Sequence, residues 1–100
     1  MAYNKVTVEG LTPFAYESVT VADTAIGLTS GTYSDAIRAE MTLETAQIRF
    51  RLDGTGPTSS EGHLVEVGDV ITLNSAAQIV NFKAIRTGST SGVLKVTYFH

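Results

Sequence analysis

The chain has 100 residues and a mass of 10.6 kDa, carries a formal net charge of −3 and contains no cysteine. This length supports one core, which predicts a single domain over residues 1–100. The absence of cysteine excludes a disulfide scaffold and a thiolate nucleophile, and the mild acidity argues against a nucleic-acid partner, which requires clustered Lys and Arg.

The sequence carries no signal for a membrane. No stretch approaches the roughly 20 apolar residues that span a bilayer. The N-terminus, Met1–Lys5, lacks the basic start and apolar run of a signal peptide. We therefore expect a soluble protein that has no membrane partner and is not exported.

The composition favours β-strands throughout the chain. Val, Ile and Thr account for 10, 6 and 14 residues, and such β-branched side chains pack well on a pleated sheet. Period-two alternation of apolar residues is typical of a strand with one buried face. In the first third of the chain this alternation is weak and is limited to three pairs, namely Val6 with Val8, Val19 with Val21, and Ile26 with Leu28.

The segment 34–43 fits two interpretations. Ser34 is a good helix N-cap, so residues 34–41 could form two helical turns. Ile37, Ala39, Met41 and Leu43 also recur with period two, which predicts a strand. We favour the strand, and we expect it to form a hairpin with residues 47–52 through a turn at residues 44–46.

Alternation is clearer in the second half of the chain. Apolar residues alternate with polar or charged ones over 47–52, over 80–85 and over 94–98. Turn-forming residues separate these runs, and Gly68 with Asp69 predicts a tight hairpin between the strands on either side. The pattern as a whole predicts about eight short strands in an all-β, antiparallel β-sandwich, either immunoglobulin-like or jelly-roll-like.

No arrangement of residues indicates catalysis. A nucleophilic triad needs a base, and the histidines are His63 near a turn and His100 at the last position. Asp53, Glu61 and Asp69 also lie near turns, but their spacing matches no known metal motif. We therefore expect no catalytic residue, no metal, no cofactor and no enzymatic activity.

Several residues are candidates for contact with a protein partner. Residues 1–16 are a candidate N-terminal arm in which Tyr3, Phe14 and Tyr16 stand among polar neighbours, although the same aromatics could cover the domain's own core. Phe99 falls on the polar side of the last strand.

Arg49 and Arg51 are candidate contacts of a second kind. With Arg38, and with Lys83 or Arg86 as further members, they would form a small basic face suited to a protein interface. The alternative is a solvated face, balanced by Glu40 and Glu44 across the hairpin.

A set of short motifs resembles a pattern found in small proteins of tailed-bacteriophage genomes. The motifs span roughly residues 36–99, and they are Ile48-Arg49-Phe50-Arg51-Leu52-Asp53-Gly54-Thr55-Gly56-Pro57-Thr58, Gly62-His63-Leu64, Gly68-Asp69, Phe82-Lys83-Ala84-Ile85-Arg86 and Val96-Thr97-Tyr98. The genes of such proteins lie among the genes for virion structural proteins. The resemblance implies no catalytic residue in this chain.

The resemblance implies a structural part of the virion. The leading expectation is a capsid decoration or cement protein that binds the lattice of the phage major capsid protein, as a homo-oligomer assembled in the cytoplasm of a bacterial host. The alternatives are a tail, neck, baseplate or fibre component and, in another class, a module that binds host glycans. The absence of tryptophan counts against the glycan module, because sugars often stack on aromatic rings.

Overall fold

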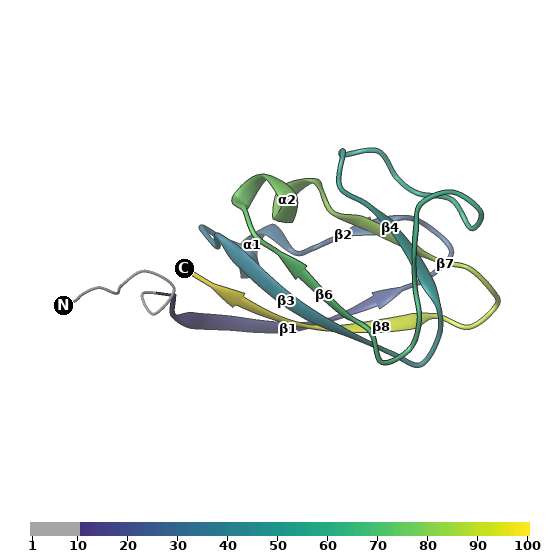
Figure 1. Ribbon diagram of the computed structural model, residues 1–100, viewed down its shortest axis with the longest axis horizontal. Helices are drawn as coiled ribbons and strands as arrows, with labels where there is room; N and C mark the ends of the chain where they lie inside the picture. The colour runs from purple at the N-terminus through teal and green to yellow at the C-terminus, as the bar shows by residue number, and fades with distance from the viewer. Residues whose placement is uncertain (1–10) are drawn as a thin grey trace.

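The computed structural model describes residues 11–100, which form eight strands and two short helices (Figure 1). In chain order the elements are β1 (Pro13–Val21), β2 (Ile26–Gly27), α1 (Ser30–Tyr33), β3 (Arg38–Glu44), β4 (Ile48–Arg51), β5 (His63–Val65), β6 (Val70–Leu73), α2 (Ala76–Asn81), β7 (Lys83–Arg86) and β8 (Gly92–Phe99). Among these residues, no helix is long and apolar enough to cross a membrane.

The strands form two antiparallel sheets of four strands each. One sheet has the order β1-β8-β3-β6, and the other has the order β2-β7-β4-β5. This interleaved order is that of a jelly roll, in which two Greek keys wrap around one core. The predicted all-β sandwich of about eight strands is confirmed, and of its two versions the jelly roll is the one observed.

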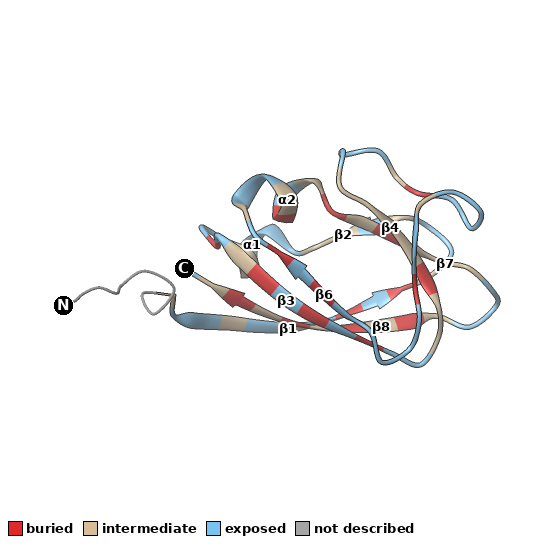
Figure 2. Cartoon of the chain, in the orientation of Figure 1, coloured by how far each residue is buried: buried red, intermediate tan, exposed pale blue. Residues whose placement is uncertain are grey.

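The core lies between the two sheets, and alternate residues of the long strands point into it (Figure 2). In β8 the buried residues Leu94, Val96 and Tyr98 alternate with partly exposed neighbours, as the sequence pattern predicts. In β3 the residues Ala39 and Met41 are likewise fully buried. The segment 38–44 is therefore a strand, and the helical alternative is wrong there.

Two of the predicted hairpins do not exist. The turn at residues 44–46 joins β3 to β4, and the turn at residues 66–69 joins β5 to β6, but in each case the two strands belong to different sheets. Both turns contain a residue with positive φ, Thr45 at 82° and Gly68 at 95°. Such turns reverse the chain equally well within one sheet or across the core, so turn residues alone do not distinguish the two.

The predicted strand over residues 80–85 is also partly wrong. Residues 76–81 form α2, and only the residues from Lys83 onward are extended. Ser75 caps the helix, because its side-chain oxygen accepts the N–H of Gln78 at 3.1 Å. Ile79 and Phe82 are buried three residues apart whereas Val80 between them is exposed, a spacing typical of a helix and not of a strand.

The candidate arm over residues 1–16 overlaps the first sheet. β1 begins at Pro13, and Tyr16 pairs with Thr97 of β8. Residues 1–10, which include Tyr3, Val6 and Val8, lie outside the described part of the chain.

Candidate interaction surface

The sheet β1-β8-β3-β6 presents a broad outer face rich in hydroxyl groups. Its outward residues form cross-strand rows, one through Tyr16, Thr97, Glu40 and Thr72, the next through Ser18, Lys95, Thr42 and Val70, and a third through Thr20, Val93 and Glu44. We call these eleven residues the hydroxyl face, because six of them carry a hydroxyl group. Such a surface suits contact with another protein more than enclosure of a small molecule, because binding sites for small molecules are concave.

The charges near this face are largely matched by partners within the sheet. Lys95 Nζ donates to Ser18 Oγ at 2.8 Å. Arg38 Nη2 lies 3.4 Å from Glu40 Oε2 as an exposed ion pair. The face therefore combines neutral hydroxyls with one ion pair and with Lys95 and Glu44, whose charges are opposite, so it has no strong field of one sign.

Aromatic side chains gather at one end of the hydroxyl face. A register shift between Pro13 and Ala15 takes Phe14 out of regular pairing, and its ring lies 4.0 Å from that of His100. Phe99 lies beneath the Arg38 guanidinium, which sits 5.8 Å from the ring centre. A small open depression of about 200 Å³ is lined here by Leu11, Arg38, Glu40 and Phe99.

Three of the candidate contact residues therefore belong to the same sheet. Phe14 and Tyr16 lie on β1 and Phe99 ends β8, at the same end of the paired strands. Tyr16 exposes 60% of its surface and Phe14 exposes 36%, so neither side chain is buried in the core.

Arg49 belongs to the opposite sheet and is occupied within the chain. Its Nη1 donates to Gly62 O at 2.9 Å, and its Nε donates to Ser59 O at 3.1 Å. These two bonds fasten the long β4–β5 connection to the strand that precedes it. Arg49 is thus placed to hold its own loop.

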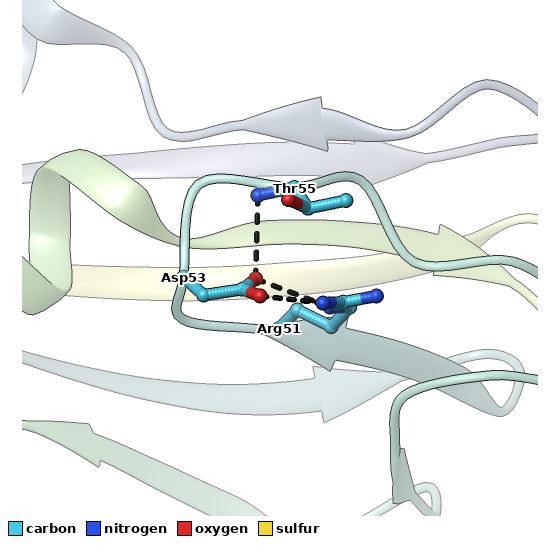
Figure 3. A network of polar contacts seen from close by, with 3 residues as sticks. All are labelled: Arg51, Asp53 and Thr55. Carbon is cyan, nitrogen blue, oxygen red and sulfur yellow. Dashed lines mark hydrogen bonds and ion pairs between the residues drawn. The ribbon is translucent and has the colours of Figure 1, made fainter.

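Arg51 makes a local ion pair with Asp53, whose carboxylate also accepts the N–H of Thr55 at 3.3 Å (Figure 3). The hydrogen bond with Asp53 raises the pKa of Arg51, and the same bond lowers the pKa of Asp53 below its ordinary value. The pair organises the turn that leaves β4.

The basic face expected around these arginines is not assembled as predicted. Lys83 pairs in register with Arg51, but Arg38 lies in the other sheet. Glu40 and Glu44 also cannot neutralise Arg49 and Arg51 across a hairpin, because β3 and β4 are not paired.

A buried polar contact fixes the position of β1 relative to α1. Tyr98 is fully buried, and its hydroxyl donates to Glu17 Oε2 at 2.5 Å. The same carboxylate oxygen accepts the N–H of Thr29, just before α1, at 3.1 Å. Burial, and then the contact with Glu17, raise the pKa of Tyr98 because both oppose a phenolate.

The loops at one end of the sandwich surround the largest depression described, of about 440 Å³ and open to solvent. Its polar lining includes Asp23, Arg86 and Thr87. His63 lies elsewhere, exposed on β5, with its ring 5.3 Å from that of Phe50. Within residues 11–100, no three His, Cys, Asp or Glu side chains form a group that could hold a metal ion.

Sequence reasoning missed the hydroxyl face as a unit. Outward residues, most of them polar, alternate with buried apolar residues in β3 and β8 and at the end of β1, and that alternation is visible in the sequence. It does not reveal which strands are neighbours, so Ser18, Thr42 and Lys95 do not stand out together before the register is known.

Comparisons with models of protein families, with curated proteins and with solved structures find no match to this chain.

Proposed function

We propose that this chain is a structural protein of a bacteriophage virion, and that it acts as a decoration or cement protein on the lattice of the major capsid protein. The sequence motifs between residues 36 and 99 suggest the phage context. The observation that carries the choice of role is the hydroxyl face, a broad exposed sheet surface with aromatic side chains at one end.

Adhesion in many copies fits this surface better than tight binding by a single copy. Exposed hydroxyls and an exposed ion pair each form modest contacts, and the two remaining charges of the face, Lys95 and Glu44, are of opposite sign. A repeated lattice multiplies such contacts through avidity. A protein that binds the assembled lattice, but not free subunits, stabilises the assembled state by mass action.

The fold is compatible with this role without establishing it. Jelly rolls occur in viral capsid domains, in lectins and in cupins. Because one fold serves many functions, the exposed surface and not the topology supports the role.

Cryo-electron microscopy of purified particles tests the proposal directly. We expect density for this sandwich at regular positions on the head, with the hydroxyl face against the capsid protein. Density confined to the tail, neck, baseplate or fibres would replace the decoration role with another virion role. Particles without this chain, together with saturable binding to a glycan array, would replace it with a glycan-binding module.

A binding assay with matched variants identifies the contacting surface. Purified protein is added to heads that lack it, and Tyr16→Ala is compared with Leu64→Ala. Both side chains are exposed, at 60% and 47%, but they lie on opposite sheets. We expect Tyr16→Ala to weaken binding about tenfold, as loss of an aromatic anchor does, and Leu64→Ala to leave it unchanged. Equal binding of both variants would exclude the aromatic end as the contact.

A further inference from the structure

The four edges of the two sheets differ greatly in length. The edge strands β2, β5 and β6 have two, three and four residues, whereas β1 has nine. Short edge strands are one of the ways in which proteins avoid pairing with other chains. Among residues 11–100, β1 is the long edge strand and pairs only with β8, so within this part of the chain its other side offers a row of backbone groups.

The register identifies which residues offer these groups. In β3, Leu43 N donates to Asp69 O on the β6 side, so the odd-numbered residues of β3 face β6 and the even-numbered ones face β8. The even-numbered residues of β3 are paired with odd-numbered residues of β8, so the even-numbered residues of β8 direct their backbone groups to β1. The odd-numbered residues of β1 bond to β8, and Tyr16, Ser18 and Thr20 direct their N–H and C=O groups to the free side.

We propose that β1 pairs antiparallel with β1 of a second copy of this chain about a two-fold axis at Ser18. Tyr16 then lies opposite the partner's Thr20, and the two Ser18 residues face each other. All three side chains are exposed and uncharged, so no repulsion opposes the pairing. This inference is independent of the proposed virion role.

The register is self-complementary, which favours a second copy as the occupant, because no two like charges meet across the axis. On the inward side the same register places Glu17 opposite the partner's Val19, so the two carboxylates do not oppose each other. Glu17 is moreover already engaged by Tyr98 and by the N–H of Thr29. One sequence therefore satisfies both sides of the contact, as an isologous interface requires.

The dimer would join the two four-stranded sheets into one continuous sheet of eight strands. An axis perpendicular to the sheet keeps both hydroxyl faces on the same side. Each dimer would thus present a doubled hydroxyl face, with two groups of aromatic residues.

Sedimentation equilibrium of the full chain over a range of concentrations tests this inference. We expect a monomer–dimer equilibrium for the natural protein. Ser18→Glu should weaken the dimer at least about tenfold, because it sets two carboxylates opposite each other at the axis.

Thr42→Glu is the matched control, because Thr42 and Ser18 flank the same Lys95 from either side. It adds the same charge to the same face, but on an interior strand, so the dimer should keep its affinity. A natural protein that stays monomeric, or equal weakening by both variants, would overturn the proposal.

Disulfide trapping gives a second readout, aided by the absence of native cysteine. Directly opposite residues in a hydrogen-bonded antiparallel pair have Cα atoms about 5.5 Å apart, within the range of a disulfide. Ser18→Cys should cross-link under mild oxidation, and Thr42→Cys should not. If Ser18→Cys instead cross-links no faster than Thr42→Cys, while Ser18→Glu reduces attachment to capsids, the occupant of β1 is the capsid protein and not a second copy.

Discussion

The two sheets of this molecule share one core but differ in what they do with their outer surfaces. The β1-β8-β3-β6 sheet has strands of nine, eight, seven and four residues, whereas the β2-β7-β4-β5 sheet has strands of two, four, four and three. The long sheet leaves its outward hydroxyls and aromatics exposed. The short sheet uses Arg49 to hold its own loop, and Arg51 to hold a turn.

This difference suggests a division of labour between the two sheets. In the short sheet, Arg49 and Arg51 are engaged by the connection that follows β4, so these two side chains complete the structure of their own sheet. The long sheet is already held by its ladders and its core, so its surface is available for a partner. The predictions below test each half of that comparison.

The largest effect is expected at the start of β8, where Gly92 packs against the β3–β4 turn and β4. A Cβ atom on Gly92 would lie 2.7 Å from Ala46 O and 2.7 Å from Ile48 Cγ2, at the start of β8. Gly92→Ala should therefore lower the free energy of unfolding by about 3 kcal/mol, the upper range for overpacking. Gly88→Ala is the control, because nothing lies within 4 Å of its Cβ position. Denaturant unfolding of both variants measures the contrast, and an equal effect would contradict the close packing.

The next effect concerns the contact between Tyr98 of β8 and Glu17 of β1. Tyr98→Phe removes the hydroxyl that donates a hydrogen bond to Glu17. This loss should lower the free energy of unfolding by about 1.5 kcal/mol. Tyr16→Phe alters an exposed tyrosine and should be neutral. Chemical denaturation at pH 7 distinguishes the two variants, and equal stability would show that the buried contact contributes nothing.

The same variant has a distinct pH dependence. Because the pKa of Tyr98 is raised above 10.0 in the folded state, the unfolded chain releases this proton first as the pH rises. The contribution of the Tyr98 hydroxyl to the free energy of unfolding is complete below pH 10. Above pH 10 this contribution declines, by up to about 1.4 kcal/mol per pH unit. The difference in stability between natural protein and Tyr98→Phe should accordingly shrink above pH 10. A constant difference up to pH 11 would contradict a raised pKa.

A smaller effect is expected on the short sheet. Arg49→Met keeps the aliphatic stem but loses the bonds to Ser59 O and Gly62 O, at a cost of about 1 kcal/mol. Hydrogen exchange should increase in residues 53–62 and remain unchanged in β1 and β8. Increased exchange throughout the chain would mean that Arg49 supports the whole fold and not only its loop.

The smallest effect is expected at Arg51. Its pair with Asp53 is exposed, so Arg51→Met should leave the unfolding midpoint unchanged within error. The pKa of Asp53 should rise toward its ordinary value, because the hydrogen bond that lowers it is gone. An NMR titration of the Asp53 carboxyl measures this shift, and an unaltered pKa would show that the pair is not formed in solution.

Local patterns predicted the fold class well, because alternation in β3 and β8 reports burial directly. They failed where the outcome depends on distant segments. The turns at Thr45 and Gly68 looked like hairpins, yet the strands that they join face each other across the core. α2 was missed because its six residues are too few to display a clear helical period.

The candidate site was predicted in part, for a similar reason. Phe14, Tyr16 and Phe99 were proposed because aromatic residues stand out among polar neighbours, and the structure places all three at one end of the same sheet. Arg49 was read as a free surface charge, because its partners Ser59 and Gly62 are backbone carbonyls that leave no mark in the sequence.

The pairing of β1 with β8 has a consequence for how the chain folds. Lys95 meets Ser18 and Tyr98 meets Glu17 across separations of 77 and 81 residues, and β8 is the central strand between β1 and β3 (Figure 1). Closing such long loops is slow, and folds dominated by distant contacts form in milliseconds to seconds. During synthesis β1 and β3 leave the ribosome well before the strand that joins them. The larger sheet therefore cannot be completed before β8 (Gly92–Phe99) has been synthesised.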